Sequence, residues 1–217
     1  MNTTVAFLAQ TLAIFMGFFT RVVFTRTLSE GYVGINGLFT DTLNILSLSE
    51  LGVGTAITYA LYAPIARRDI KKQQILMRMF RNFYRITAGF VLLAGLCLIP
   101  FLDILMKDRP DVNHLIIIYL LYLLNSVVSY LLIYKKTLVD AHQMNYITVM
   151  YHNGFLVLQD ILQIMVLFLT RNFILFLVIA VVCTIIGNIC MSRKADRLFP
   201  YLKEPCKEQL PQEERHD

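Results

Sequence analysis

The chain has 217 residues, of which 57% are hydrophobic and only 16% are charged, and its mean hydropathy is +0.60. An average soluble domain is about 45–50% apolar and about 25% charged, so this chain lacks the charged surface that a soluble domain needs. Its 15 Phe and 11 Tyr residues exclude a disordered chain. The composition therefore predicts an integral membrane protein.

Six apolar segments are long enough to cross a bilayer as helices, which takes about 20 residues each. They are residues 5–25, 34–62, 86–106, 115–134, 146–169 and 173–191. The first lacks the basic start and the cleavage site of a signal peptide. We therefore expect an all-α integral membrane fold with about six transmembrane helices over residues 1–192. The charged residues 193–217, which include three prolines, are expected to form a cytoplasmic linker or tail.

The distribution of basic residues predicts which side of the membrane each connection occupies, because cytoplasmic loops collect Lys and Arg. With six spans, 15 of the 20 basic residues fall on one side and 5 on the other. The smaller group is Arg21, Arg26, Lys107, Arg109 and Arg171. Both termini are therefore expected in the cytoplasm of a multi-pass protein of the cell membrane. The excess of Lys and Arg is explained by the cytoplasmic loops, and no basic motif is interleaved with aromatic residues. We therefore do not expect nucleic-acid binding.

Residues 67–85 combine seven basic residues with apolar residues near helical spacing. This pattern fits an interfacial helix lying on anionic headgroups. It also fits an ordinary cytoplasmic loop that leads into the third span.

Polar residues inside the first two spans are candidates for function, because polar groups in hydrocarbon are costly. Gln10, Gly17 and Arg21 are spaced to share one helix face. Arg21 could reach an anionic ligand or extend to the membrane surface. In the second span, Asp41 shares a face with Asn44, Thr55 and Tyr59 if the helix is unbroken.

Glu50 in the second span points nearly opposite to Asp41, although Gly52 and Gly54 could break the helix between these carboxylates. Each carboxylate could carry a proton or bind a cation, or could cap a broken helix or pair with Arg21.

The fourth and fifth spans carry further polar faces. Tyr122 and Asn125 belong to a face with Tyr119, Ser126 and Ser129, which suits a glycan but also fits interface anchoring by tyrosine. On the fifth span, His152, Gln159 and Gln163 form one stripe, with Asn153 and Asp160 beside it. This sector resembles the lining of an aqueous cavity, and the alternative is a polar seam between helices.

Motifs for catalysis, cofactors and metals are missing from the sequence. It contains no phosphate-binding Gly loop, no G-x-S-x-G and no H-E-x-x-H. The four cysteines have no metal-like spacing, and His152 has no second histidine four residues later. We therefore expect neither a cofactor, nor a metal site, nor an enzymatic activity.

Several sequence blocks resemble the polysaccharide and O-antigen flippases of the multidrug/oligosaccharidyl-lipid/polysaccharide exporter superfamily. The longest block is GINGLFTDTLNILS followed by LSELGVGTAITYALYAPIARRD, residues 34–69. RVVF at residues 21–24, NSVVSY at residues 125–130 and YKKTLVDAHQMNYI at residues 134–147 fit the same family. Members of this family usually have twelve or more spans in two related lobes. The resemblance therefore implies that this chain corresponds to the N-terminal lobe of a two-lobe transporter.

The resemblance also implies a substrate and roles for single residues. The substrate would be an oligosaccharide on a polyprenyl diphosphate, moved to the outer leaflet by alternating access for surface polysaccharide export. Arg21 would contact the diphosphate, and Asp41 and Glu50 would couple transport to an ion gradient. From the polar faces above, Tyr122, Asn125, Gln159 and Gln163 are further substrate-binding candidates and Asp160 a further coupling candidate.

Partners implied by this interpretation are membrane lipids and a missing C-terminal lobe or partner subunit. The alternatives are a drug/cation antiporter of the same superfamily and a membrane glycosyltransferase or polymerase. A glycosyltransferase or polymerase would be expected to carry a long outer loop with catalytic residues, which this sequence lacks.

Overall fold

The computed structural model describes residues 2–47, 53–102 and 114–203, and every regular element in these ranges is helical. The long helices, in chain order, are α1 (Asn2–Thr27), α2 (Glu30–Ser47), α3 (Val53–Ala66), α4 (Ile70–Leu98), α6 (Leu115–Leu131), α7 (Ile133–Ala141), α8 (Asn145–Thr170) and α9 (Phe173–Leu198). Two short 3-10 turns, η2 (Ile99–Phe101) and η3 (Pro200–Lys203), follow α4 and α9.

Four described helical segments are long and apolar enough to cross a membrane: Phe7–Thr27, Ile70–Phe101, Asn145–Thr170 and Phe173–Leu198. The bent pair α6 and α7 makes a fifth if the two helices form one span. A shorter apolar helix covers Thr55–Ala66. The all-helical fold with membrane-spanning helices is therefore confirmed to this extent, with four or five candidate spans in the described residues.

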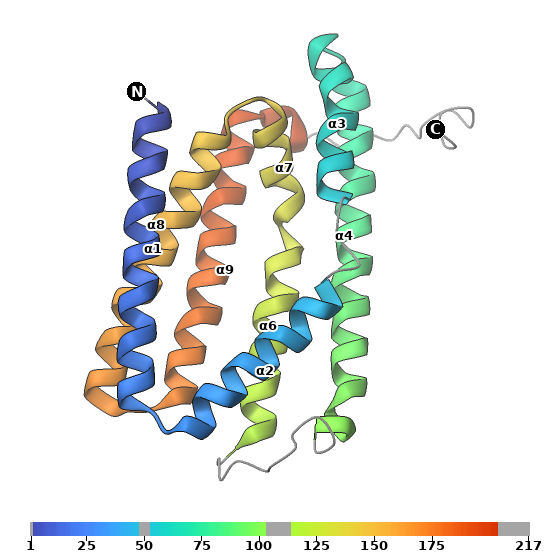
Figure 1. Cartoon of the computed structure of the whole chain (residues 1–217). Coiled ribbons are helices and arrows are strands. Elements are labelled where there is room, and N and C mark those ends of the chain that lie inside the picture. The colour runs from blue at the N-terminus through green and yellow to red at the C-terminus, as the bar shows by residue number, and fades with distance from the viewer. Residues whose placement is uncertain (1, 48–52, 103–113, 204–217) are drawn as a thin grey trace.

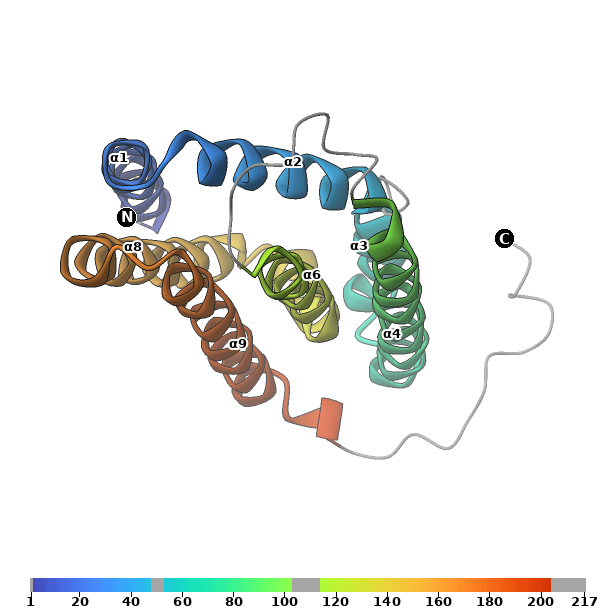
Figure 2. The same cartoon turned by 90° about the horizontal axis from the view of Figure 1, so that it is seen from below.

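The helices stand side by side, except that α2 crosses obliquely in front of α6 (Figure 1). α1 packs along α8, α8 packs on α9, and α6 lies between α9 and α4 (Figure 2). The turns at residues 67–69 and 142–144 lie at one end of the molecule with the end of α9, and we call this the basic end. The α1–α2 and α8–α9 connections lie at the opposite end (Figure 1).

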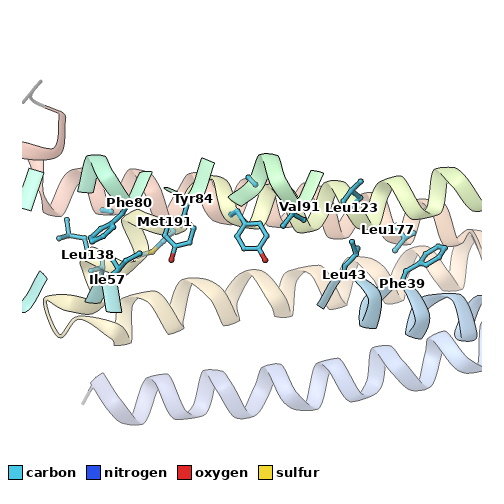
Figure 3. Packing of buried hydrophobic residues seen from close by; sticks show 14 of the residues in the cluster. Phe39, Leu43, Ile57, Phe80, Tyr84, Val91, Leu123, Leu138, Leu177 and Met191 are labelled. Atoms are coloured by element: carbon cyan, nitrogen blue, oxygen red, sulfur yellow. The ribbon is translucent and has the colours of Figure 1, made fainter. Parts of the chain in front are cut away.

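Apolar side chains both fill the bundle and cover its outside. Phe39, Val91 and Leu123 are buried in the cluster that joins α2, α4 and α6 (Figure 3). Phe15 and Phe18 are exposed, together with other large apolar residues on the outer faces of α1, α4, α8 and α9. A soluble protein rarely leaves so much apolar surface in water, so the outer faces are suited to lipid.

Close approach between α4 and α6 depends on Gly95. A Cβ at this buried position would lie 2.3 Å from Cδ1 of Leu123 on α6. The Tyr119 hydroxyl donates a hydrogen bond of 2.8 Å to the Gly95 carbonyl across the same contact. Small residues allow helix backbones to pack this closely where no hydrophobic drive joins helices.

The second predicted span, residues 34–62, is not one described helix. α2 ends at Ser47 and α3 begins at Val53, and residues 48–52 lie outside the described part of the chain. The prediction that Asp41 and Tyr59 share one helix face assumed one unbroken helix. Because residues 48–52 lie between them and outside the described part of the chain, that prediction does not extend from α2 to α3.

Residues 70–85 form the first half of α4 and continue directly into the third predicted span. The side chain of Asp69 begins this helix by accepting a hydrogen bond of 3.0 Å from the Lys72 backbone N–H. Arg67 and Arg68 lie in the turn before α4, and the other five basic residues of this segment belong to a helix that continues into a candidate span, without a separate interfacial helix.

The first part of the predicted tail belongs to the helical body. The boundary at residue 193 falls inside α9, which continues to Leu198. Beyond it, the Tyr201 hydroxyl donates a hydrogen bond of 2.6 Å to Oε1 of Gln73 on α4. Burial raises the pKa of Tyr201 to about 12, so the hydroxyl remains a donor at neutral pH.

Candidate functional site

A cavity of about 280 Å³ lies among α6, α7, α8 and α9. Its polar lining comprises Asn125, Ser129, Lys136, Thr148, His152, Gln159, Thr184 and Asn188. Tyr151, Phe155 and aliphatic residues supply the apolar part of the lining. This mixture of amides, hydroxyls, basic groups and aromatic rings is typical of a small-molecule site, whose volume is about 300–1,000 Å³.

The cavity lies where the α6–α7 pair is broken. The helix is interrupted at Leu132, which lies in the cavity wall, and the two halves are bent by 42°. One turn before the break, the Asn188 side chain donates a hydrogen bond of 3.1 Å to the Val128 carbonyl. In lipid, backbone groups near a break need such partners, and broken helices line substrate cavities in transporters.

Close packing of α9 on α8 closes another side of the cavity. A Cβ on Gly187 would lie 3.1 Å from Cγ of Phe155, so the glycine allows the ring to lie against the α9 backbone. Both residues line the cavity.

The two adjacent lysines of α7 have different environments. Nζ of Lys135 lies 2.7 and 2.8 Å from the two carboxylate oxygens of Asp196 and donates a hydrogen bond of 2.8 Å to Ser192. This ion pair ties α7 to α9. Lys136 lines the cavity. Within the described ranges, its side chain forms no hydrogen bond or ion pair.

The polar residues of α8 divide between two faces. His152 and Gln159 line the cavity, as the cavity interpretation of this helix predicts. Asn153 instead donates a hydrogen bond of 2.8 Å to Gln10 on α1, and Asp160 accepts one of 2.9 Å from Thr20. The alternative interpretation, a polar seam between helices, therefore describes this second face.

Gln163 is buried outside the cavity lining, and its amide donates a hydrogen bond of 3.0 Å to the Phe176 carbonyl on α9. Tyr122 also lies outside the lining, because its hydroxyl donates to the Asn36 side chain on α2. Asn125 lines the cavity, and its buried Oδ1 has no hydrogen-bond partner among the described residues. Four residues outside α1 were predicted to contact the substrate, and the structure places two of them, Asn125 and Gln159, in the lining of the same cavity.

The charged candidates of α1 and α2 lie outside the cavity. Gln10 and Gly17 face α8 as their spacing predicts, and a Cβ on Gly17 would lie 3.9 Å from Asp160. Arg21 and Asp41 are exposed. Neither side chain forms an ion pair with the other or with another residue in the described part of the chain. Glu50 lies outside the described residues.

Sequence reasoning missed four polar residues of the lining: Lys136, Thr148, Thr184 and Asn188. The last two are isolated polar residues within the long apolar run of α9. Such residues in a spanning segment are expected to face protein or a water-filled space, so they carried a usable signal.

Comparison of the chain with protein-family models, curated proteins and solved structures finds no match.

Proposed function

We propose that this chain is a lobe of a membrane transporter, rather than an enzyme, that moves polyprenyl-diphosphate-linked oligosaccharide across the cytoplasmic membrane. The observation that carries the proposal is a cavity at a broken helix, with amide, hydroxyl and basic groups in a largely apolar lining, inside a bundle whose outer faces are apolar. Amides and hydroxyls suit the hydroxyl groups of a sugar, and basic groups suit a phosphate. The resemblance of residues 34–69 to polysaccharide flippases supports the same substrate class.

We propose six spans, in which α2 and α3 together form the second and α6 and α7 the fourth. The turns at residues 67–69 and 142–144 share one end of the molecule with the end of α9, which supports this topology. Because these segments carry an excess of Lys and Arg, the basic end faces the cytoplasm. The cavity reaches toward this end through Lys136 and Thr148, so it can receive a substrate made in the cytoplasm.

Cysteine labelling tests this topology. In a background without the native cysteines, a membrane-impermeant maleimide added outside should label Ser29→Cys, which lies between α1 and α2. It should leave Lys71→Cys, at the start of α4, unlabelled until the cells are permeabilised. The reverse pattern would contradict the proposed orientation, and labelling of both positions from outside would contradict the number of spans.

A second lobe completes the proposed transporter. Arg21 is exposed on α1, whose other exposed residues are largely apolar, and Asp41 and Asn44 are exposed on α2 together with Glu30 and Thr40. Polar groups in hydrocarbon are expected to face protein or water, so this face suits a partner lobe and a central aqueous path. Alternating access would then arise from rocking of the two lobes.

Deletion of the gene in its native organism tests the proposed function. The expected result is loss of surface polysaccharide, with lipid-linked repeat units accumulating on the inner leaflet. A polymerase would instead leave single repeat units on the surface. A drug/cation antiporter would leave the polysaccharide unchanged and make the cells sensitive to cationic drugs, and either outcome would refute the flippase proposal.

A further inference from the structure

The two adjacent lysines of α7 differ in whether a carboxylate forms an ion pair with them. Successive residues of a helix point about 100° apart. Lys135 therefore faces α9, where Asp196 neutralises it, while Lys136 faces the cavity. The nearest carboxylate to Lys136 along α7 is Asp140, one turn later, and it accepts a hydrogen bond of 2.7 Å from Thr148.

Lys136 thus forms no ion pair within the described residues, and the Asp140 carboxylate interacts with its charge only from beyond ion-pair distance. Lys136 is half-buried in the wall of a cavity, where an unpaired charge costs free energy unless water or an anion compensates it. His152 on α8 lines the same cavity and can donate a further hydrogen bond. The ammonium group of Lys136 gives this part of the cavity a positive potential.

The other polar residues of the lining carry no charge. From Thr148 to Gln159 the cavity follows eleven residues of α8, or roughly 16 Å at 1.5 Å per residue. Lys136 on α7 and His152 in the first third of α8 lie near the α7–α8 turn at the basic end, whereas Asn125, Gln159 and Thr184 lie within the inner parts of α6, α8 and α9. An elongated ligand with a negative group at one end and hydroxyl groups at the other matches this order.

We propose that Lys136 and His152 form the binding site for a phosphate or diphosphate ester, which enters the cavity from the basic end. This inference deepens the proposed function, and it rests on that function only for the identity of the natural substrate. The shared chemistry could come from a polyprenyl diphosphate or from the headgroup of an anionic phospholipid.

Binding of farnesyl diphosphate to the purified protein in nanodiscs of neutral phosphatidylcholine tests the site. Wild-type protein should bind this compound and should not bind uncharged farnesol. Lys136→Met keeps the aliphatic stem and removes the charge, so it should weaken binding by at least about tenfold, the effect of one charged hydrogen bond. Lys136→Arg should retain most of the affinity.

Lys194→Met is the matched control. Lys194 lies near the end of α9, at the basic end but outside the cavity lining. The proposal is wrong if Lys136→Met binds like wild type, or if Lys194→Met weakens binding as strongly, since the effect would then be one of general surface charge. Thermal unfolding of each variant shows whether a loss of binding is a loss of folding.

Two further measurements complete the test. One identifies the kind of molecule that carries the phosphate group. The other distinguishes failure of this binding site from failure of the proposed function. Competition by phosphatidylglycerol in the nanodisc would identify a phospholipid headgroup as an occupant, whereas its failure to compete would favour the polyprenyl diphosphate. If binding depends on Lys136 but the deletion strain has normal polysaccharide, this binding site is supported and the flippase proposal is refuted. If the deletion strain loses its polysaccharide but binding does not depend on Lys136, the flippase proposal is supported and this binding site is refuted.

Discussion

Arg21→Ala is expected to abolish export of surface polysaccharide, whereas Arg21→Lys should retain part of it. Arg21 is exposed near the end of α1 opposite to the basic end, and it has no ion-pair partner in the described ranges. A guanidinium is always charged, and its planar donors match two phosphate oxygens at once. Lysine keeps the charge but loses this two-point geometry, so its activity should be intermediate.

Arg26→Ala is a suitable control, because Arg26 is also exposed and lies in the last turn of the same helix. It should leave export unchanged. Cell-surface polysaccharide is measured relative to the amount of each variant in the membrane. Normal export by Arg21→Ala at normal abundance would mean that Arg21 only reaches the membrane surface, and the diphosphate contact would be refuted.

Arg21 and Lys136 would act at different stages of transport. Lys136 lies toward the basic end of the cavity, and Arg21 lies toward the opposite end on the exposed face of α1. In the proposed orientation, Lys136 would meet the phosphate group from the cytoplasmic side, and Arg21 would contact it nearer the outer side.

Helices were predictable where apolar residues continue for a full span. Residues 5–25, 146–169 and 173–191 lie within α1, α8 and α9, because a predominantly apolar segment of span length satisfies its backbone in lipid as a helix. The break between α6 and α7 was not predictable, since neither glycine nor proline stands near Leu132. It coincides with a tertiary contact, the hydrogen bond from Asn188 to the Val128 carbonyl.

The helical spacing within residues 67–85 was recognised, but the continuity of this helix, α4, with the third predicted span was not, because basic residues interrupt the apolar run. Lys71, Arg78 and Arg85 reduce the hydropathy of its first half, although they are good helix formers. Asp69, which caps this helix, was the available signal.

The cavity could be predicted only in part. His152 and Gln159 were expected to line it, but Asn153 and Asp160 are their immediate neighbours in sequence and face α1 instead. A helical wheel gives the angles between side chains, yet it does not show which neighbour each face meets. The same limit left Gln163 among the cavity residues, whereas its amide bonds the backbone of α9.

Gly95→Ala is expected to destabilise the bundle, although alanine is the better helix former by about 1 kcal/mol. The new Cβ would lie 2.3 Å from Cδ1 and 2.9 Å from Cδ2 of Leu123, which is itself buried. Relieving this overlap displaces α4 from α6 and weakens the hydrogen bond from Tyr119 to the Gly95 carbonyl. Overpacking of this kind costs about 1–3 kcal/mol, which exceeds the gain in helix propensity.

Gly89→Ala on the same helix provides the comparison, since a Cβ at Gly89 meets no atom within 4 Å. It should leave stability unchanged or increase it by up to about 1 kcal/mol. Unfolding of both variants in detergent gives the two free energies, and a double-mutant cycle with Leu123→Ala assigns the difference to the contact. The double variant should lose about 0.5–3 kcal/mol less than the sum of the single losses, because alanine at position 123 removes the obstructing methyl groups. Equal stability of Gly95→Ala and Gly89→Ala would show that α4 and α6 can separate freely, and the close packing at Gly95 would then contribute nothing to the fold.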